Sequence, residues 1–308
     1  MFPDFLGIGA QKAGTKWLHH NLKKHPEIWV PTLGDLREDL PKGRTEVHYF
    51  DKWVDKGLLD DRSYALLFER GRGRITGDIT PAYSILDERR IHHARSLMPD
   101  AKIIFLMRNP VERTWSQTVQ FFDRRGLKLQ SLSESRLRDF FSRTGVRLRS
   151  SYLDILKNWQ KFYPEEQFFV GFLEDIHFYP DRLLDRLYRF LGASASADYR
   201  ITRDKIFSRG TQEFPTRLAA HLAQAYHEDL RKLDERFGGY VSFWLYCAER
   251  LINDPPAEEY IPYPLWDSYL WEEWVSSSGE SPVVGSRLGK PQSGPLPSIT
   301  TTSGGGRA

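Results

Sequence analysis

The stretch GIGAQKAGTKWL, residues 7–18, joins an apolar run to a segment with the spacing of an amphipathic helix. The overlapping letters FLGIGA suit a short strand that ends in glycines. Trp17, Leu18 and Leu22 then recur at helical spacing until the His-Pro pair at 25–26 stops the pattern. A glycine loop between a strand and a helix points backbone N–H groups and the positive end of the helix dipole at an anion. The sequence therefore predicts a phosphate-binding loop near its start.

This loop differs from that of an ATP or GTP enzyme. Gly9 and Gly14 have the usual spacing, and a lysine, Lys12, lies inside the loop. Thr15 and Lys16 then stand in the reverse of the usual Lys-Ser/Thr order. A Ser or Thr directly after the lysine normally holds Mg²⁺, together with an acidic residue at the end of a neighbouring strand. Because this pair is missing, we expect lysines and main-chain amides to bind the phosphate without a metal ion.

Further strands and helices alternate along the chain. The segments at 73–79, 101–110 and 166–176 are expected to be strands. The run AKIIFLM at the second of these has no polar alternation, which predicts burial on both faces of a parallel sheet. Apolar spacing predicts helices at 151–163, 180–192 and 215–239. This alternation predicts an α/β fold, with a central, mostly parallel sheet flanked by helices.

A second phosphate site is predicted where the buried strand ends. Arg108 follows it directly, at the edge where open α/β sheets bind ligands. Pro110 can start a helix that carries Ser116 one to two turns further on. A guanidinium and a hydroxyl suit a phosphate monoester, although alone this pattern equally fits a strand-end ion pair. Together with the first loop it favours a ligand with two separate phosphate-like groups, such as a nucleotide substituted at both 5′ and 3′ positions.

These motifs resemble those of sulfotransferases that use 3′-phosphoadenosine 5′-phosphosulfate (PAPS). IGAQKAGTKWL resembles their 5′-phosphosulfate loop, and FLMRNPVERTWSQ resembles their 3′-phosphate motif. TEVHYFD (45–51) and ITPAY (79–83) are similar to EVHFFD and KTPAY of the heparan-sulfate glucosaminyl O-sulfotransferase group. FSRGT (207–211) falls where that group has a Ser-Lys-Gly-Arg loop touching the cofactor. The resemblance runs from residue 5 to about 240 and implies a P-loop NTPase-like, three-layer fold.

The resemblance also implies roles for individual residues. Glu46 would take the proton of the acceptor hydroxyl, with His48 as a second base or an orienting group. Lys12 would neutralise charge on the leaving oxygen, and Pro81 and Tyr83 would line the acceptor pocket with Glu46 and His48. No metal ligand is expected. The residues expected to hold PAPS are Lys12, Ala13, Gly14, Thr15, Lys16, Trp17, Arg108, Ser116, Arg209, Gly210 and Thr211.

A base is required on chemical grounds as well. An acceptor hydroxyl must lose a proton, and a positioned carboxylate or imidazole typically contributes ~10²–10⁴ in rate. Strand-like alternation would put Glu46 and His48 on one side of an extended segment. By residue type alone, Glu46 would be a surface carboxylate and His48 a structural imidazole, and only the resemblance favours Glu46 as the base. Ile79 replaces the lysine of KTPAY, which leaves open whether Lys16 or another cation takes its place.

Composition limits the possible partners and compartments. The formal net charge of +3 gives no reason to expect a nucleic-acid partner. The single cysteine, Cys247, excludes a disulfide framework, and neither a signal peptide nor a membrane span is apparent, so a cytoplasmic location is expected. The arginines at 136–149 could bind a polyanionic acceptor or form a solvated helical face. The acceptor (a glycan, lipid or secondary-metabolite hydroxyl) and the oligomeric state stay open.

Composition also divides the chain. We expect a sulfotransferase domain at 1–252, an aromatic and acidic extension at 253–275 and a disordered, low-complexity tail at 276–308. The extension could pack on the domain or bind a partner. Two other functions are considered, a P-loop kinase of small molecules using ATP and Mg²⁺, and a non-catalytic scaffold. The reversed order of Thr15 and Lys16 argues against the kinase.

Overall fold

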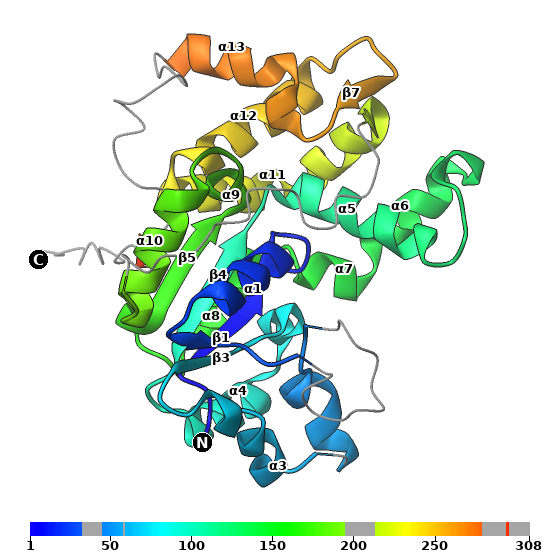
Figure 1. Cartoon of the computed structure of the whole chain (residues 1–308). Coiled ribbons are helices and arrows are strands. Elements are labelled where there is room, and N and C mark those ends of the chain that lie inside the picture. Colours follow the sequence, from blue (N-terminus) through cyan, green and yellow to red (C-terminus); the bar gives the residue numbers. More distant parts are fainter. Residues whose placement is uncertain (33–44, 58, 195–212, 279–293, 296–308) are drawn as a thin grey trace, which may run out of the picture.

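The computed structural model describes residues 1–32, 45–57, 59–194, 213–278 and 294–295. Within these residues, a central sheet has the strand order β2-β3-β1-β4-β5-β8 (Figure 1). The first five strands are parallel and β8 is antiparallel to β5. In that order their bounds are Ile28–Trp29, Ile75–Ile79, Phe5–Gly9, Lys102–Met107, Phe168–Phe172 and Gly294–Pro295. The prediction of a mostly parallel α/β sheet is therefore confirmed.

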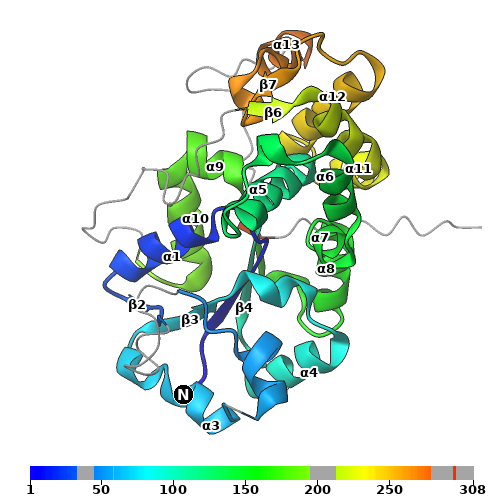
Figure 2. The ribbon, with the colours of Figure 1, turned by 90° about the vertical axis from the view of Figure 1, so that its right-hand side faces the viewer.

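Helices cover both faces of the sheet. Figure 2 shows α1 (Thr15–Lys24) and α10 (Pro180–Leu191) on one side, with α4 (Glu88–Leu97) and α8 (Tyr152–Gln160) on the other. Every residue of β1 and β5 is buried, and so is every residue of β4 except Lys102, because both faces of these strands meet helices. This gives the predicted three layers, and the near-continuous apolar strands follow from their double burial.

The other elements complete the helical layers and a small second sheet. The predicted helices at 151–163, 180–192 and 215–239 are confirmed as α8, α10 and α11 (Thr216–Phe237), each slightly shorter than expected. The other α-helices among the described residues are α3 (Asp61–Leu66), α5 (Pro110–Asp123), α6 (Glu134–Ser142), α7 (Thr144–Leu148), α9 (Leu173–Phe178), α12 (Tyr240–Asn253) and α13 (Tyr269–Ser278). The second sheet pairs β6 (Glu213–Pro215) with β7 (Tyr260–Pro262) in antiparallel register.

The strand predicted at 166–176 is too long. The strand β5 ends at Phe172 and α9 begins at Leu173, so Glu174 and Asp175 are helical. Carboxylates in the first turn of a helix are favoured by the helix dipole. A hydrogen bond also fixes this turn, because the buried carboxylate of Glu174 accepts from the indole N–H of Trp244 at 2.6 Å. The apolar pattern continues through the boundary, which is why it gave no sign of the change.

The aromatic extension packs on the rest of the chain. Its strand β7 pairs with β6, and Trp271 of α13 meets Phe243 of α12 edge to face with ring centroids 4.7 Å apart. Its buried apolar side chains are Ile261, Leu265, Trp266, Leu270 and Trp274. Of the tail expected to be disordered at 276–308, residues 276–278 continue α13 and Gly294–Pro295 forms β8. The other residues of the tail lie outside the described residues.

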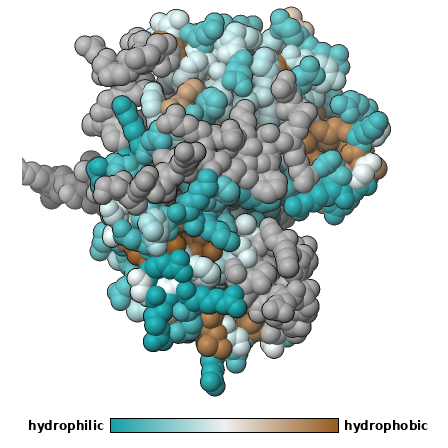
Figure 3. All heavy atoms as spheres, in the orientation of Figure 1, coloured by the Kyte–Doolittle hydropathy of each residue, from teal (hydrophilic) through white to brown (hydrophobic). Residues whose placement is uncertain are grey.

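On the face seen in Figure 3, the described residues are mainly hydrophilic. Figure 3 shows separate hydrophobic patches on the face seen in Figure 1 rather than one continuous apolar surface. The exposed large apolar side chains among the described residues are spread over separate parts of the chain and are Met1, Leu66, Leu148, Tyr260 and Tyr269. Among the described residues, no helix has both the length and the apolar character needed to cross a bilayer.

Candidate active site

The predicted phosphate loop lies between β1 and α1, at the carboxyl end of the sheet. Lys12 and Gly14 both have positive φ angles, of 76° and 88°. The φ of Gly14 lies in the left-handed region, which favours glycine, and a Cβ there would lie 2.4 Å from Cδ1 of Ile176, so that the end of this side chain would have to move. Gly14 caps α1 without a side-chain hydrogen bond, and the first turn of α1 has no acidic residue. No acidic side chain in the first turn of α1 therefore competes for the backbone N–H groups at this helix end, which suits an external anion.

Arg108 lies beside this loop because β4 pairs directly with β1. Its Nη1 donates to the carbonyl oxygen of Lys12 at 3.2 Å, which ties the end of β4 to the loop. The guanidinium is buried, its residue being only 6% exposed. The backbone carbonyl of Arg108 accepts from the phenol of Tyr152 at 2.7 Å, and Asn109 caps α5 by accepting from the N–H of Val111 at 3.0 Å. These contacts fix the direction of the arginine and of the helix that carries Ser116.

Glu46 and His48 meet at the neighbouring part of the same edge. The Nε2 of His48 lies 3.0 Å from Oε2 of Glu46, and its Nδ1 lies 2.9 Å from Oδ2 of Asp51. The prediction that an extended segment aligns them is wrong, because His48 has φ 61° and ψ 28° and a π-helix begins at Tyr49. The two side chains meet through this turn, and the imidazole bridges two carboxylates.

The charges of this pair follow from its surroundings. Burial lowers the pKa of His48, but hydrogen bonds to Asp51 and Glu46 outweigh burial and raise the pKa to about 9. Burial raises the pKa of Glu46, but the hydrogen bond and charge of His48, with the charges of Lys16 and Lys52, bring it below its usual value. At neutral pH the imidazole is therefore protonated and the Glu46 carboxylate is ionised.

A buried polar network attaches this segment to β3. The hydroxyl of Thr80, at the end of β3, accepts from the backbone N–H groups of Val47 at 3.0 Å and His48 at 3.3 Å. It donates in turn to Asp78 at 2.7 Å, and the phenols of Tyr83 and Tyr64 donate to the same carboxylate at 2.8 and 3.1 Å. Burial raises the pKa of Asp78 to about 6 despite these hydrogen bonds.

Sequence reasoning assigned no role to Asp51, Asp78, Thr80 or Tyr263. A carboxylate in a strand expected to be buried could have indicated the Asp78 network. No local pattern indicated Tyr263, whose hydroxyl accepts from Nη2 of Arg108 at 2.5 Å across 155 positions.

The other predicted residues occupy several environments. Ala13, Thr15 and Trp17 are buried, while Lys16 is half-buried. Pro81 begins a 3₁₀ turn and is buried. Tyr83 has no exposed surface, and its hydroxyl is held between Asp78 and the backbone N–H of Tyr49. Arg209, Gly210 and Thr211 lie outside the described residues.

Two buried carboxylates lie near Arg108. Oε1 of Glu112 lies 3.9 Å from the guanidinium and accepts from the backbone N–H of Leu265 at 2.9 Å. Burial and the charge of Glu112 raise the pKa of Glu174 to about 8. Glu174 is therefore protonated at neutral pH, which limits the negative charge around the arginine.

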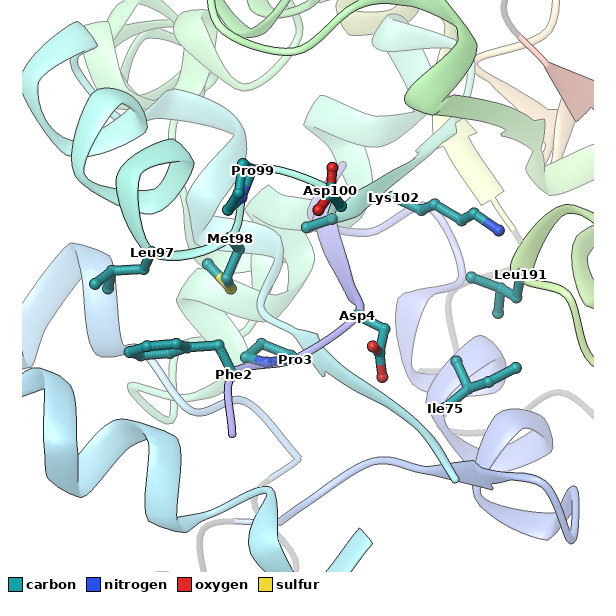
Figure 4. Close-up of a pocket in the computed structure, with 11 residues that line it drawn as sticks. Phe2, Pro3, Asp4, Ile75, Leu97, Met98, Pro99, Asp100, Lys102 and Leu191 are labelled. Carbon is teal, nitrogen blue, oxygen red and sulfur yellow. The ribbon is translucent and has the colours of Figure 1, made fainter. Parts of the chain in front are cut away.

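A separate cavity of about 390 Å³ lies at the opposite edge of the sheet (Figure 4). Asp4, Ile75 and Lys102 line it at the amino ends of β1, β3 and β4. It therefore does not belong to the candidate site at the carboxyl ends. Among the described residues, no group of three or more His, Cys, Asp or Glu side chains could hold a metal ion.

We expect His48 to make stability depend on pH. Because folding raises the pKa of His48 from 6.5 to about 9, its contribution is complete below pH 6.5 and is lost as the pH rises towards 9. The free energy of unfolding should fall over this interval by less than the limit of about 1.4 kcal/mol per pH unit, since solvent screens the partly exposed Glu46. In urea titrations at several pH values, His48→Gln should reduce the dependence of the free energy of unfolding on pH. His92→Gln, at an exposed histidine, should not. An unchanged slope in His48→Gln would contradict the half-buried ion cluster of Glu46, His48 and Asp51.

Three comparisons place these features among known proteins. Residues 3–197 match the family described as the sulfotransferase family. The chain is 31% identical over 227 residues to heparan sulfate glucosamine 3-O-sulfotransferase 6 of Mus musculus, covering 70% of this chain and 58% of that protein. It is 29% identical over 224 residues to the human 3-O-sulfotransferase 3B1, covering 69% of this chain and 51% of that protein. The chain thus spans little more than half the length of these curated relatives.

The fold also matches a solved structure. A sulfotransferase from Alicyclobacillus acidocaldarius superposes with a TM-score of 0.55 at 24% identity. The match covers 76% of this chain and 95% of that chain. At this identity the likeness supports the fold and not the choice of substrate.

Proposed function

Because the chain belongs to the sulfotransferase family, we propose that it transfers a sulfuryl group from PAPS to a hydroxyl of a glycan or small molecule. The observation that carries this proposal is the meeting of three features at the carboxyl ends of β3, β1 and β4. They are the Glu46–His48 pair, the glycine loop and Arg108. This edge of a parallel sheet is where open α/β folds bind ligands.

The described residues fit the two phosphate ends of PAPS. Lys12, Ala13 and Gly14 of the loop would hold the 5′-phosphosulfate, which carries the sulfuryl group, together with Thr15 and Lys16 in the first turn of α1. Arg108 and Ser116 would hold the 3′-phosphate. An observation that supports this is the Nε of Arg108, which is buried and has no hydrogen-bond partner among the described residues. A buried guanidinium N–H without an acceptor suits an anionic ligand.

Glu46 is proposed as the general base. Its lowered pKa keeps it ionised at neutral pH, so that it can accept the hydroxyl proton as the acceptor oxygen attacks sulfur. His48 is already protonated at that pH and is proposed to orient the Glu46 carboxylate rather than to accept a proton. Thr80 holds the backbone of this segment in place.

Lys12 and Lys16 are proposed to supply the positive charge. Lys12 would stabilise the negative charge that develops on the leaving oxygen when the oxygen–sulfur bond breaks. The charge of Lys16 helps to lower the pKa of Glu46, which supports Lys16 as the substitute for the lysine that Ile79 replaces. Ile79 itself is buried in β3, beside Gly7.

The acceptor is proposed from the relatives by analogy. The two curated relatives are named as heparan sulfate glucosamine 3-O-sulfotransferases, which supports a glycan hydroxyl. Because Ile79 stands where those enzymes have a lysine, the acceptor could also be a small molecule that is less acidic than a sulfated glycan. No observation in the structure favours the kinase, whose lysine and Mg²⁺-binding hydroxyl would stand in the other order. A cytoplasmic location stays a prediction.

The proposal predicts that the chain sulfates a hydroxyl when incubated with PAPS. A panel of glycan, lipid, phenol and alcohol acceptors should yield at least one product heavier by one SO₃, measured by mass spectrometry. Adenosine 3′,5′-bisphosphate should raise the melting temperature of the chain more than ATP with Mg²⁺ does, because it fits both phosphate sites. Stabilisation by ATP–Mg²⁺ alone would favour the kinase. Binding of the bisphosphate without turnover on any acceptor would favour the non-catalytic scaffold.

A further inference from the structure

The aromatic extension reaches the predicted 3′-phosphate site. Tyr263 follows β7, and contacts on either side of it in the sequence fix its position. Before it, β7 pairs with β6. After it, the N–H of Leu265 donates to the Glu112 carboxylate at 2.9 Å. Trp266 stacks on His177, with ring centroids 5.0 Å apart. The extension therefore has a defined position against α5 and α9, and Tyr263 lies over Arg108.

The phenol of Tyr263 lies at both groups proposed to bind the 3′-phosphate. Its oxygen accepts from Nη2 of Arg108 at 2.5 Å. Burial raises the pKa of this phenol, and the neighbouring side chain of Ser116 opposes that rise. The guanidinium also lies over its ring, 5.2 Å from the centroid. Tyr263, Arg108 and Ser116 thus form one cluster, although they come from distant parts of the chain.

Two donors of this cluster lack a good acceptor. The Nε–H of Arg108 is buried without a partner among the described residues. The phenol proton of Tyr263 has its acceptor, the backbone carbonyl of Glu112, at a distance of 3.5 Å, the outer limit of a hydrogen bond. Leaving such donors unsatisfied is costly, and a phosphate monoester offers several oxygens that could accept from both at once.

We infer that Tyr263 is a further ligand of the 3′-phosphate and completes the site formed by Arg108 and Ser116. This inference rests on the proposed use of a 3′-phosphorylated adenosine nucleotide. The phenol donates to a phosphate oxygen, while the guanidinium uses its free Nε–H and keeps its contact with the ring. The aromatic extension is then part of the nucleotide site rather than a separate module.

The test compares two nucleotides that differ only in the 3′-phosphate. The full chain and its Tyr263→Phe variant are titrated calorimetrically with adenosine 3′,5′-bisphosphate and with adenosine 5′-phosphate. Loss of one hydrogen bond to a charged group should weaken binding of the bisphosphate roughly 10- to 100-fold. Binding of the 5′-phosphate should change less than about twofold, because it makes no contact with this cluster. The ratio of the two affinities separates loss of a phosphate ligand from general damage to the fold.

Two variants serve as controls. Tyr260→Phe makes the same change at an exposed tyrosine of the same extension and should leave both affinities unchanged. Ser116→Ala should lower the affinity for the bisphosphate selectively, as Tyr263→Phe does. If the wild-type chain does not prefer the bisphosphate, the proposed nucleotide and this inference both fail. If the wild type prefers it and Tyr263→Phe keeps or increases that preference, only this inference fails, and the phenol instead occupies the place of the phosphate.

Discussion

Replacing Glu46 with glutamine is expected to lower kcat roughly 10²- to 10⁴-fold, the usual contribution of a general base. Glutamine keeps the size of the side chain and can still lie beside His48, but it cannot accept a proton at neutral pH. The affinity for adenosine 3′,5′-bisphosphate should change less than about twofold, because the carboxylate would contact the acceptor and not the nucleotide. Initial rates with PAPS at saturating acceptor, together with calorimetric titration of the bisphosphate, would measure both effects.

The matched control is Glu88→Gln, at an exposed glutamate whose carboxylate pairs with Lys161 on the surface. This variant should keep the full rate. A Glu46→Gln variant with normal turnover would remove Glu46 from the role of base. Loss of nucleotide binding in the same variant would instead indicate that Glu46 supports the first turn of α1, which carries Lys16.

Replacing Lys12 with methionine should lower kcat on the order of 10²- to 10³-fold, the range seen when one donor to a developing negative charge is removed. Methionine keeps the unbranched shape, and the left-handed backbone at this position already accommodates a side chain, with φ 76°. The carbonyl that accepts from Arg108 is also retained. Single-turnover rates would isolate the transfer step from nucleotide release.

Lys23→Met, on the exposed last turn of the same helix α1, is the control for loss of a positive charge. It should leave the single-turnover rate unchanged. If Lys12→Met weakens nucleotide binding but keeps the rate of transfer, Lys12 binds the ground state only, and the charge on the leaving oxygen must be stabilised by another group. Lys16 would then be the next residue to test.

Much of the fold could be predicted because its signals are local. The glycine loop, the apolar strand β4 and the helix α10, which starts at Pro180 and ends before Gly192, each depend on residues within a few positions of one another. The last of these buries Leu183, Leu184 and Leu187 as its spacing predicts. The errors arose where two local patterns overlap. Apolar letters run through the end of β5 into α9, and alternation at Glu46 and His48 gave no sign of the turn between them.

The candidate site was only partly accessible from the sequence. The loop and strand-end patterns indicated Lys12 and Arg108, and the resemblance indicated Glu46, but neither showed what holds these residues in place. The support for the Glu46 segment comes from Thr80, at the end of a strand more than 30 positions away, with a hydrogen bond across 33 positions. This contact joins a segment outside the sheet to the end of β3, and no local pattern in the sequence indicates it.

The amino-acid sequence by itself determined the strand–loop–helix at the start, the buried parallel strands and the charged residues available at their ends. Backbone conformation at glycines and the spacing of apolar side chains depend on near neighbours, so these features are written in short stretches of sequence. Only the tertiary structure decided that the imidazole of His48 is shared by two carboxylates and that Tyr263 lies on Arg108. The physical reason is that the order of the strands in the sheet brings together residues that are far apart in the sequence. Their separation along the chain does not predict their distance in space.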